Sequence, residues 1–317
     1  MINTGIPQES WDEALIELGG GILQSRAWAQ FQADLGRKVV YGQGEGWMWC
    51  GSVVEGRGVK YLYVPYGPAV GTGEDWLRSL QAAGKQEGVD FVRFEPIGNI
   101  SQEALSRGRR IPDMQPSRSW VLDLSSTPEQ LRANLSSGNR NIINKSERSG
   151  LVLRSSSSER DIKLFLDMLH DTAGKSGFRP HSDKYMTALL ATLMPQGATK
   201  LFFAGMDGKE VAGAIGFDFG GTRYYAHAAS FQQLNKELQA ARPLVWHMIL
   251  DAKAAGLTKF DFWGVAPSDQ PNHPWAGLSK FKQSFGGEPV EYAGTYDIPI
   301  KSVKYLFYRL VKRILPL

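Results

Sequence analysis

The chain has 317 residues, 42% of them hydrophobic and 21% charged, a balance typical of a folded globular protein and not of a disordered chain. This length favours about two domains of ordinary size. The formal net charge is only +4, which fits a nucleic-acid binder, an enzyme of phosphate-bearing substrates and a plain soluble protein equally well.

Cysteine content and hydropathy exclude several further classes. The single cysteine, Cys50, excludes an internal disulfide framework and a zinc site built from cysteines. No stretch approaches 18 consecutive apolar residues, and the N-terminus lacks a basic segment followed by an apolar run. We therefore expect a cytoplasmic protein with neither a signal peptide nor a transmembrane helix.

The first third of the chain alternates helical and strand patterns. Helices are predicted at 11–18, 27–35 and 75–87, and strands at 39–41, 47–54, 59–64 and 90–95. Pro65, Gly67 and Pro68 end the third strand, because proline cannot donate to a strand ladder and glycine permits a turn. The polar segment 98–116 is interpreted as the crossing between two domains.

A second series of elements follows. Strands are predicted at 120–124, 151–155, 200–206, 210–219, 222–229, 259–263 and 289–296, and helices at 127–150, 159–172, 182–193 and 238–255. This order is similar to that of the acetyltransferase (GNAT) architecture, in which an antiparallel sheet opens beside a helix. We therefore predict an α/β fold of two GNAT-like lobes with mixed sheets flanked by helices, comprising residues 1–116 with 297–317 and residues 117–296.

A GNAT-like lobe raises the question of a coenzyme A donor. Members that use CoA place a glycine-containing turn before the long helix, so that backbone N–H groups hold the pyrophosphate. The corresponding junction here, residues 230–238 (SFQQLNKEL), contains no glycine. A CoA-type N-acyltransferase is therefore an alternative function and not the expected one.

Five stretches together resemble the FemAB/FemX family of tRNA-dependent peptidoglycan aminoacyltransferases. They are residues 25–31 (SRAWAQF), 63–68 (YVPYGP), 91–96 (FVRFEP), 139–150 (NRNIINKSERSG) and the pair 261–264 with 281–287 (DFWG and FKQSFGG). The resemblance runs in order through nearly the whole chain and is to the compact, FemX-like form without a coiled-coil insertion. It implies transfer of an amino acid from aminoacyl-tRNA to an amine of the peptidoglycan stem peptide, on UDP-MurNAc-pentapeptide or lipid II, in formation of the interpeptide bridge.

The resemblance implies a catalytic lysine. Negative charge develops on oxygen during acyl transfer, so a fixed cation is useful, and Lys282 of the Phe281–Lys282 pair matches the family position. Phe281 is a candidate substrate contact. Lys280 would share a strand face with Lys282 and is a candidate phosphate contact, and the sequence leaves open which lysine points inward. A solvated lysine before a glycine turn is the plain alternative.

An acidic residue is also expected near the attacking amine. Glu95 ends an apolar strand, where it has no packing role, and the family carries an acidic residue at the matching place. It is predicted either to accept the amine's proton, to orient the amine, or to pair with Arg93 or Arg118.

Other candidate substrate contacts follow from the resemblance. Arg179 matches an arginine that contacts the nucleotide-linked substrate, with helix-end capping as the alternative. The compact family member has a lysine where this chain has Gln32, which puts that phosphate contact in doubt and leaves Arg37 or Lys38 as substitutes. Further candidates for the substrate cleft are Tyr66, Gly67, Tyr225 and His227.

Two basic segments complete the predictions. Arg140, Lys145 and Arg148 are assigned to one helix that either contacts tRNA or is a solvated face. Residues 301–317 are predicted to form a basic amphipathic helix whose apolar stripe packs on the first lobe, the alternative being peripheral contact with the inner face of the membrane. The stripe comprises Val303, Leu306, Phe307, Leu310, Val311 and Ile314.

We expect no cofactor beyond the aminoacyl-tRNA co-substrate, no metal and a monomer. His227 has no second histidine or cysteine at ligand spacing, so packing or substrate contact is expected there. A non-catalytic protein that binds tRNA or muropeptide is the remaining alternative function. The sequence leaves open which amino acid is moved, how many are added, and which stem-peptide amine accepts it.

Overall fold

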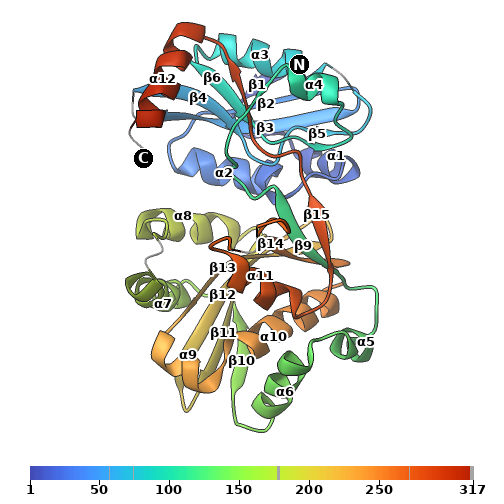
Figure 1. The fold of residues 1–317 in the computed structure, drawn as a ribbon, viewed down its shortest axis with the longest axis vertical. Coiled ribbons are helices and arrows are strands. Elements are labelled where there is room, and N and C mark those ends of the chain that lie inside the picture. Colours follow the sequence, from blue (N-terminus) through green and yellow to red (C-terminus); the bar gives the residue numbers. More distant parts are fainter. Residues whose placement is uncertain (57, 74, 177–178, 271, 315–317) are drawn as a thin grey trace. The chain divides into compact units, whose positions relative to one another are not determined.

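A computed structural model describes residues 1–314 except 57, 74, 177–178 and 271. The chain forms two compact units (Figure 1). Unit 1 comprises Met1–Ser117 with Tyr292–Leu317, and unit 2 comprises Arg118–Glu291. Each unit is a mixed sheet with helices packed on it, so the predicted α/β class is confirmed. No helix among the described residues is long and apolar enough to span a bilayer.

Unit 1 is built on the sheet order β1-β2-β3-β4-β6-β16-β8, with β5 paired to β3 and β7. Its strands are β1 (Ile2–Thr4), β2 (Val39–Gly44), β3 (Trp47–Gly56), β4 (Val59–Val64), β5 (Ala69–Val70), β6 (Phe91–Phe94), β7 (Ile97–Gly98), β8 (Arg109–Arg110) and β16 (Tyr296–Pro299). Its helices are α1 (Trp11–Glu17), η1 (Ile22–Gln24), α2 (Arg26–Asp34), α3 (Trp76–Gln86), α4 (Gln102–Ser106) and α12 (Ser302–Ile314). The segment 98–116, predicted as a crossing, therefore carries α4 and β8 and lies within unit 1.

A buried ion pair joins the C-terminal segment to the rest of unit 1. Arg93 on β6 and Asp297 on β16 are direct partners across the ladder, and the guanidinium donates to both carboxylate oxygens at 2.8 and 2.9 Å. Tyr305 of α12 donates a third hydrogen bond to Asp297 at 3.0 Å. Because all three side chains are buried, this network holds β6, β16 and α12 in one arrangement.

Unit 2 has the sheet order β10-β11-β12-β13-β14-β9-β15. Its strands are β9 (Arg118–Asp123), β10 (Val152–Ser156), β11 (Thr199–Met206), β12 (Lys209–Phe219), β13 (Thr222–Ser230), β14 (Lys259–Gly264) and β15 (Glu288–Glu291). Its helices are α5 (Pro128–Ala133), α6 (Ser137–Ser146), α7 (Arg160–Ser176), α8 (Asp183–Leu193), α9 (Gln232–Leu238), α10 (Ala241–Ala254) and α11 (Ala276–Gln283).

Helices cover both faces of the sheet of unit 2. On β11, Phe202 belongs to the apolar cluster that includes the buried residues of α10. The next residue, Phe203, points to the other face, where Phe165 and Met168 of α7 pack against Gly213. A Cβ at Gly213 would lie 3.1–3.2 Å from these three side chains, so glycine allows the helix to approach the sheet.

Two predicted elements are divided in two, and a third, the helix predicted at 238–255, begins later as α10. The stretch 127–150 forms α5 and α6, because Ser136 caps a new helix by accepting a hydrogen bond from the N–H of Asn139. The stretch 238–255 is interrupted at Gln239, whose φ of 50° ends α9 before α10 begins. The single strand predicted at 289–296 is wrong: β15 pairs with β9 in unit 2, and β16 pairs with β6 in unit 1.

Candidate functional site

The sheet of unit 2 opens between two parallel strands. β13 and β14 are paired from Thr222 with Lys259 to Tyr224 with Asp261, and their described pairing ends there. Beyond this point β13 continues along β12, whereas β14 pairs Gly264 with Ser119 of β9. Trp263 has a φ of 64°, a conformation that is costly for a bulky residue and marks the irregular end of the strand. This opening is the candidate functional site.

Helix α11 brings one lysine to the opening. Lys282 is 5% exposed, and its Nζ donates a hydrogen bond to the carbonyl oxygen of Gly264 at 2.6 Å. Burial lowers the pKa of Lys282 to about 8, and the negative charge of Asp261 acts in the opposite direction. At neutral pH the side chain is therefore a cation in surroundings that disfavour its charge.

Asp261 supplies the negative charge beside this lysine. Its Oδ1 accepts hydrogen bonds from the Ser119 hydroxyl and, at 2.7 Å, from the N–H of Trp263. Burial raises the pKa of Asp261, while these hydrogen bonds and the charge of Lys282 act to lower it. The carboxylate thus fixes the backbone at the irregular end of β14 and partly balances the lysine.

Aromatic rings and two histidines line the same opening. The Trp263 ring lies edge-on to Tyr224 at 5.6 Å between centroids and to Phe217 at 6.4 Å. The ring centroid of His227 lies 6.3 Å from that of Phe217 and 6.1 Å from that of His181. His181 directly precedes the capping residue of α8. Burial lowers the pKa of His227 to about 4, so its imidazole is neutral at physiological pH.

A register shift places His227 at this site. In the ladder between β12 and β13, Tyr225 is opposite Gly216, whereas His227 is opposite Ile215. The extra residue means that Tyr225 and His227 point to opposite faces, although they are two positions apart. Tyr225 consequently packs in the apolar cluster with Phe262, on the α10 face.

In unit 1, Glu95 is held by four hydrogen bonds. Its Oε2 accepts from the Tyr63 hydroxyl at 3.0 Å and from the N–H of Tyr66 at 3.2 Å. Its Oε1 accepts from the N–H of Gln115 and from the hydroxyl of Thr295, both at 2.7 Å. Burial raises the pKa of Glu95, against the opposing effect of these bonds. The carboxylate therefore ties together four separate segments of unit 1.

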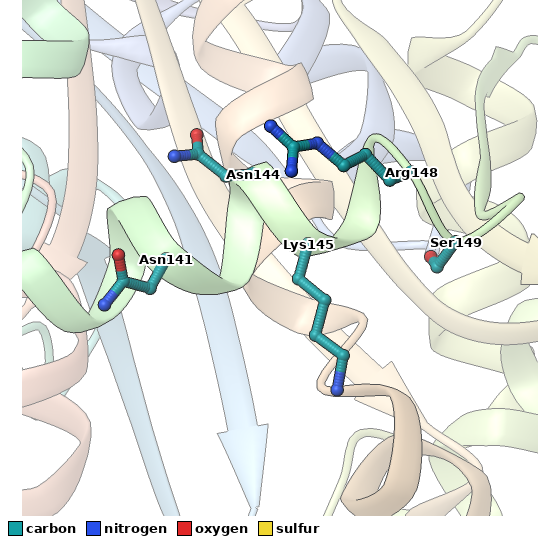
Figure 2. Close-up of a pocket in the computed structure, with 5 residues that line it drawn as sticks. All are labelled: Asn141, Asn144, Lys145, Arg148 and Ser149. Carbon is teal, nitrogen blue, oxygen red and sulfur yellow. The ribbon is translucent and has the colours of Figure 1, made fainter.

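A shallow pocket of about 500 Å³ lies along the C-terminal half of α6 in unit 2 (Figure 2). Its lining is polar and basic: Asn141, Asn144, Lys145, Arg148 and Ser149. Lys145 and Arg148 are exposed and both line this pocket, and their charged ends extend to different sides of the helix in Figure 2. Such a surface suits an anionic backbone or a phosphate group.

Metal ligands are a separate question. Within the described parts of the chain, no three His, Cys, Asp or Glu side chains are grouped so that they could hold a metal ion.

Comparisons with known proteins agree with this geometry. The FemAB family model matches residues 196–313, which contain β13, β14, α10 and α11. The match covers the C-terminal part of the chain and leaves residues 1–195 outside it.

Curated relatives match the chain over a short segment. Aminoacyltransferase FemA of Staphylococcus epidermidis is 28% identical over 91 residues, and FemA of Staphylococcus aureus is 29% identical over 91 residues. In both, the match covers 29% of this chain and 21% of the relative, so the chain spans about a fifth of the length of these relatives.

Solved structures match the fold along nearly the whole chain. FemX has a TM-score of 0.81 at 14% identity, covering 96% of this chain and 99% of FemX. L-PGS from Bacillus licheniformis gives a TM-score of 0.60 at 14% identity, covering 98% of each chain. A tandem GNAT protein from the clavulanic acid biosynthesis pathway gives 0.55 at 8% identity, covering 95% of this chain and 99% of that protein. The predicted pair of GNAT-like lobes is thereby confirmed as a fold.

The structure shows which of the two candidate lysines is buried. Lys280 and Lys282 lie on helix α11 and not on a strand, so residues two apart do not share a face. Lys280 is exposed, whereas Lys282 is buried at the opening. Phe281 packs against the apolar cluster of unit 2 and lies edge-on to Phe285, which is a packing role.

The candidate phosphate contacts of unit 1 are paired with other residues of the same unit. The Nζ of Lys38 pairs with Glu87 at 2.6 Å, and the Oε1 of Gln32 accepts from the Arg37 guanidinium at 2.6 Å. Both proposed substitutes for the family's phosphate-binding lysine are therefore occupied within the unit.

The Tyr66–Gly67 turn is fixed by buried partners. Tyr66 has a φ of 43°, and its hydroxyl donates to the carbonyl oxygen of Pro116 at 2.8 Å. A Cβ at Gly67 would lie 2.4 Å from the carboxamide of Gln24, which itself bonds the backbone of Cys50 and Pro65. Glycine is therefore required at position 67 by packing.

Other predictions for Glu95 and the basic segments need correction. Glu95 does not pair with Arg93 or Arg118, because these arginines pair with Asp297 and Glu291. Arg148 lies just beyond the end of α6, and Arg140 is not among the residues that line the pocket.

Arg179 is exposed and lies between α7 and α8. The two residues before it, 177 and 178, lie outside the described residues.

Several residues at the opening were not singled out from the sequence. Asp261 carries the same signal that identified Glu95, a carboxylate within an apolar strand, here between Phe260 and Phe262. Trp263 and His181 offered no such signal, because their positions depend on an irregular strand end and on a helix start far away in the sequence.

Proposed function

We propose that this protein is a member of the FemAB family and an aminoacyltransferase that moves an amino acid from aminoacyl-tRNA to an amine of the peptidoglycan stem peptide. The observation that carries the proposal is the buried Lys282 at the opening between β13 and β14. Two likenesses support it: the family model that covers this region, and the curated relatives named aminoacyltransferase FemA.

Lys282 is assigned the role of stabilising the oxyanion. Attack of an amine on the ester carbonyl of aminoacyl-tRNA places negative charge on the carbonyl oxygen. Collapse of this intermediate breaks the ester C–O bond, and the terminal ribose oxygen of the tRNA leaves as a hydroxyl with the proton that the amine loses. A partly buried ammonium interacts more strongly with that charge than a solvated one, because less water screens it. The hydrogen bond to Gly264 fixes the position of the Nζ, so little reorganisation is needed when the charge develops.

His227 and Arg179 are assigned to the binding of the acceptor. Arg179 is two residues from His181, whose ring neighbours His227 at the opening. A guanidinium there is suited to a phosphate of a nucleotide-linked or lipid-linked muropeptide. Glu95 is assigned a positioning role, because its oxygens already accept four hydrogen bonds.

The proposal includes the partners and the place of action. Aminoacyl-tRNA is the co-substrate, no further cofactor takes part, and the protein acts in the cytoplasm as a monomer. The acceptor is UDP-MurNAc-pentapeptide or its lipid-linked form, lipid II. Both carry a pyrophosphate on the same muropeptide.

A reconstituted assay tests the proposed function. Purified protein is incubated with a pool of charged tRNAs and with either UDP-MurNAc-pentapeptide or lipid II, and products are resolved by mass spectrometry. We expect one acceptor to gain the mass of an amino acid in a reaction that ribonuclease abolishes. No gain with any charged tRNA on either acceptor would contradict the proposal, and acetyl transfer from acetyl-CoA would favour a CoA-type acyltransferase.

The pocket on α6 is proposed to contact the tRNA backbone. Reversing two charges in the variant Lys145→Glu/Arg148→Glu is expected to weaken tRNA binding at least about tenfold and to flatten its dependence on salt. Fluorescence anisotropy with labelled tRNA at several salt concentrations measures both effects.

A matched variant separates this pocket from general charge. Lys209→Glu/Lys236→Glu reverses two other exposed lysines of unit 2 and changes the net charge equally. It is expected to weaken binding much less. Equal weakening by the two double variants would mean that the α6 pocket has no particular role.

A further inference from the structure

Helix α12 presents an apolar face to solvent. Val303, Leu306, Phe307 and Leu310 are 85%, 56%, 68% and 49% exposed. Their spacing of i, i+3, i+4 and i+7 places them on one side of the helix. The predicted packing on unit 1 is therefore wrong for these four residues of the stripe, although the helix itself does pack there. Val311 is partly buried, and the side chain of Ile314 lies outside the described residues.

The opposite side of α12 fastens the helix to unit 1. Tyr305 is buried and Tyr308 partly buried, and their rings lie 5.3 Å from that of Phe91 on β6. At the start of the helix, Lys301 and Lys304 both pair with the buried Asp90. Figure 1 shows α12 lying beside the strands of this sheet. The exposed face is thus turned away from the core by a specific set of contacts.

The charges around this face are of one sign. Besides Lys304, which pairs with Asp90, the sequence of Ser302–Ile314 has Arg309, Lys312 and Arg313 and no acidic residue. An apolar face of exposed Leu and Phe with a basic border is the pattern of a helix that lies in the plane of a membrane interface. Negatively charged headgroups complement the border, while acyl chains receive the apolar side chains.

We infer that α12 docks unit 1 onto an anionic lipid surface through Val303, Leu306, Phe307 and Leu310. A second copy of the chain is a poorer occupant, because a symmetric contact between two such helices would bring lysines and arginines of like charge together. The inference does not depend on the proposed transferase activity, since docking requires neither tRNA nor a muropeptide.

Vesicle flotation with the full chain tests this inference. Vesicles of phosphatidylcholine alone are compared with vesicles containing phosphatidylglycerol, at low and high salt. We expect the protein to float with the anionic vesicles and to remain at the bottom of the gradient when only neutral vesicles are present. High salt should release it from the anionic vesicles. The variant Leu306→Ser/Phe307→Ser is expected to lose at least tenfold in vesicle affinity. Arg309→Gln/Lys312→Gln is expected to bind more weakly than the wild type.

Matched controls separate docking from general hydrophobicity. Ile16→Ser replaces an exposed apolar residue of α1, which is 44% exposed, and should bind vesicles as the wild type does. Phe307→Cys carrying an environment-sensitive dye should shift its emission to the blue on anionic vesicles, and the buried Cys50 should not compete for the label.

Either of two results would overturn the inference. The first is a wild-type chain that does not float with anionic vesicles. The second is a serine double variant that floats as well as the wild type. A concentration-dependent dimer, abolished by the serine variant in the absence of vesicle binding, would assign the face to self-association instead.

Discussion

Replacing Lys282 with methionine is expected to slow aminoacyl transfer about 100- to 1,000-fold, the loss seen when one oxyanion-stabilising group is removed. The Nζ is the cation that α11 brings to the opening of the sheet, and it is fixed by its bond to Gly264. Methionine is of similar length and keeps the packing, so the loss should fall on kcat more than on KM.

The same substitution is expected to leave the protein at least as stable at pH 7. Burial lowers the pKa of Lys282 from 10.5 to about 8, and one pKa unit corresponds to about 1.4 kcal/mol, so the charged form costs roughly 3 kcal/mol. Methionine removes this cost but leaves the Gly264 carbonyl without the ammonium, at a cost of about 1–3 kcal/mol. A net change between about zero and a gain of about 2 kcal/mol in the free energy of unfolding is expected.

The gain should depend on pH in a defined direction. Between about pH 8 and pH 10.5 the unfolded chain still binds a proton at this lysine while the folded chain does not, so wild-type stability rises with pH. The advantage of Lys282→Met therefore shrinks across this window. Urea unfolding of both proteins at several pH values measures the difference.

The neighbouring lysine provides the control. Lys280→Met removes an exposed charge from the same helix and should leave the pH dependence of stability as in the wild type. If Lys282→Met retained wild-type transfer, the assignment of Lys282 as the stabilising cation would fail. If it destabilised the protein at pH 7, the lysine would be a structural cation.

The order of helices and strands could be predicted from local sequence patterns, but the opening of the sheet in unit 2 and its β-bulge could not. Most helices and strands were predictable because alternation and turn residues act over a few neighbours. The bulge between Tyr225 and His227 depends on how β12 pairs with β13, and no local sequence pattern indicates it. The division of 289–296 between two sheets likewise depends on partners, Ser119 for Val290 and Phe94 for Tyr296, that lie far away in the sequence.

Residues of the candidate site could be predicted from the sequence only where a charged side chain stands in an otherwise apolar strand. Glu95 was singled out because it is a carboxylate in an apolar strand. The same reasoning would have identified Asp261, whose negative charge acts on Lys282. Sequence alone could not place Lys282 inside and Lys280 outside, since that required knowing that residues 276–283 are helical. The exposed stripe of α12 was misassigned because Tyr305 and Tyr308, and not the aliphatic residues, make the packed face.

Glu95→Gln is expected to lower the free energy of unfolding by about 1–3 kcal/mol. Each carboxylate oxygen accepts one hydroxyl and one backbone N–H, namely those of Tyr66 and Gln115. A hydroxyl can rotate to accept a bond, but a backbone N–H cannot. Whichever way the glutamine amide is turned, its NH₂ group therefore faces one buried N–H donor.

Activity distinguishes a positioning carboxylate from a base. If Glu95 positions the Tyr66–Gly67 turn, Glu95→Gln should lose less than about tenfold in transfer at temperatures where it is folded, mainly through KM. Loss of a general base typically costs about 100- to 10,000-fold, and would appear in kcat. Glu103→Gln, which neutralises an exposed carboxylate of unit 1, should change neither quantity. A Glu95→Gln protein as stable as the wild type but 100-fold slower would reinstate Glu95 as the proton acceptor, because a carboxylate that only ties segments together cannot be lost without weakening them.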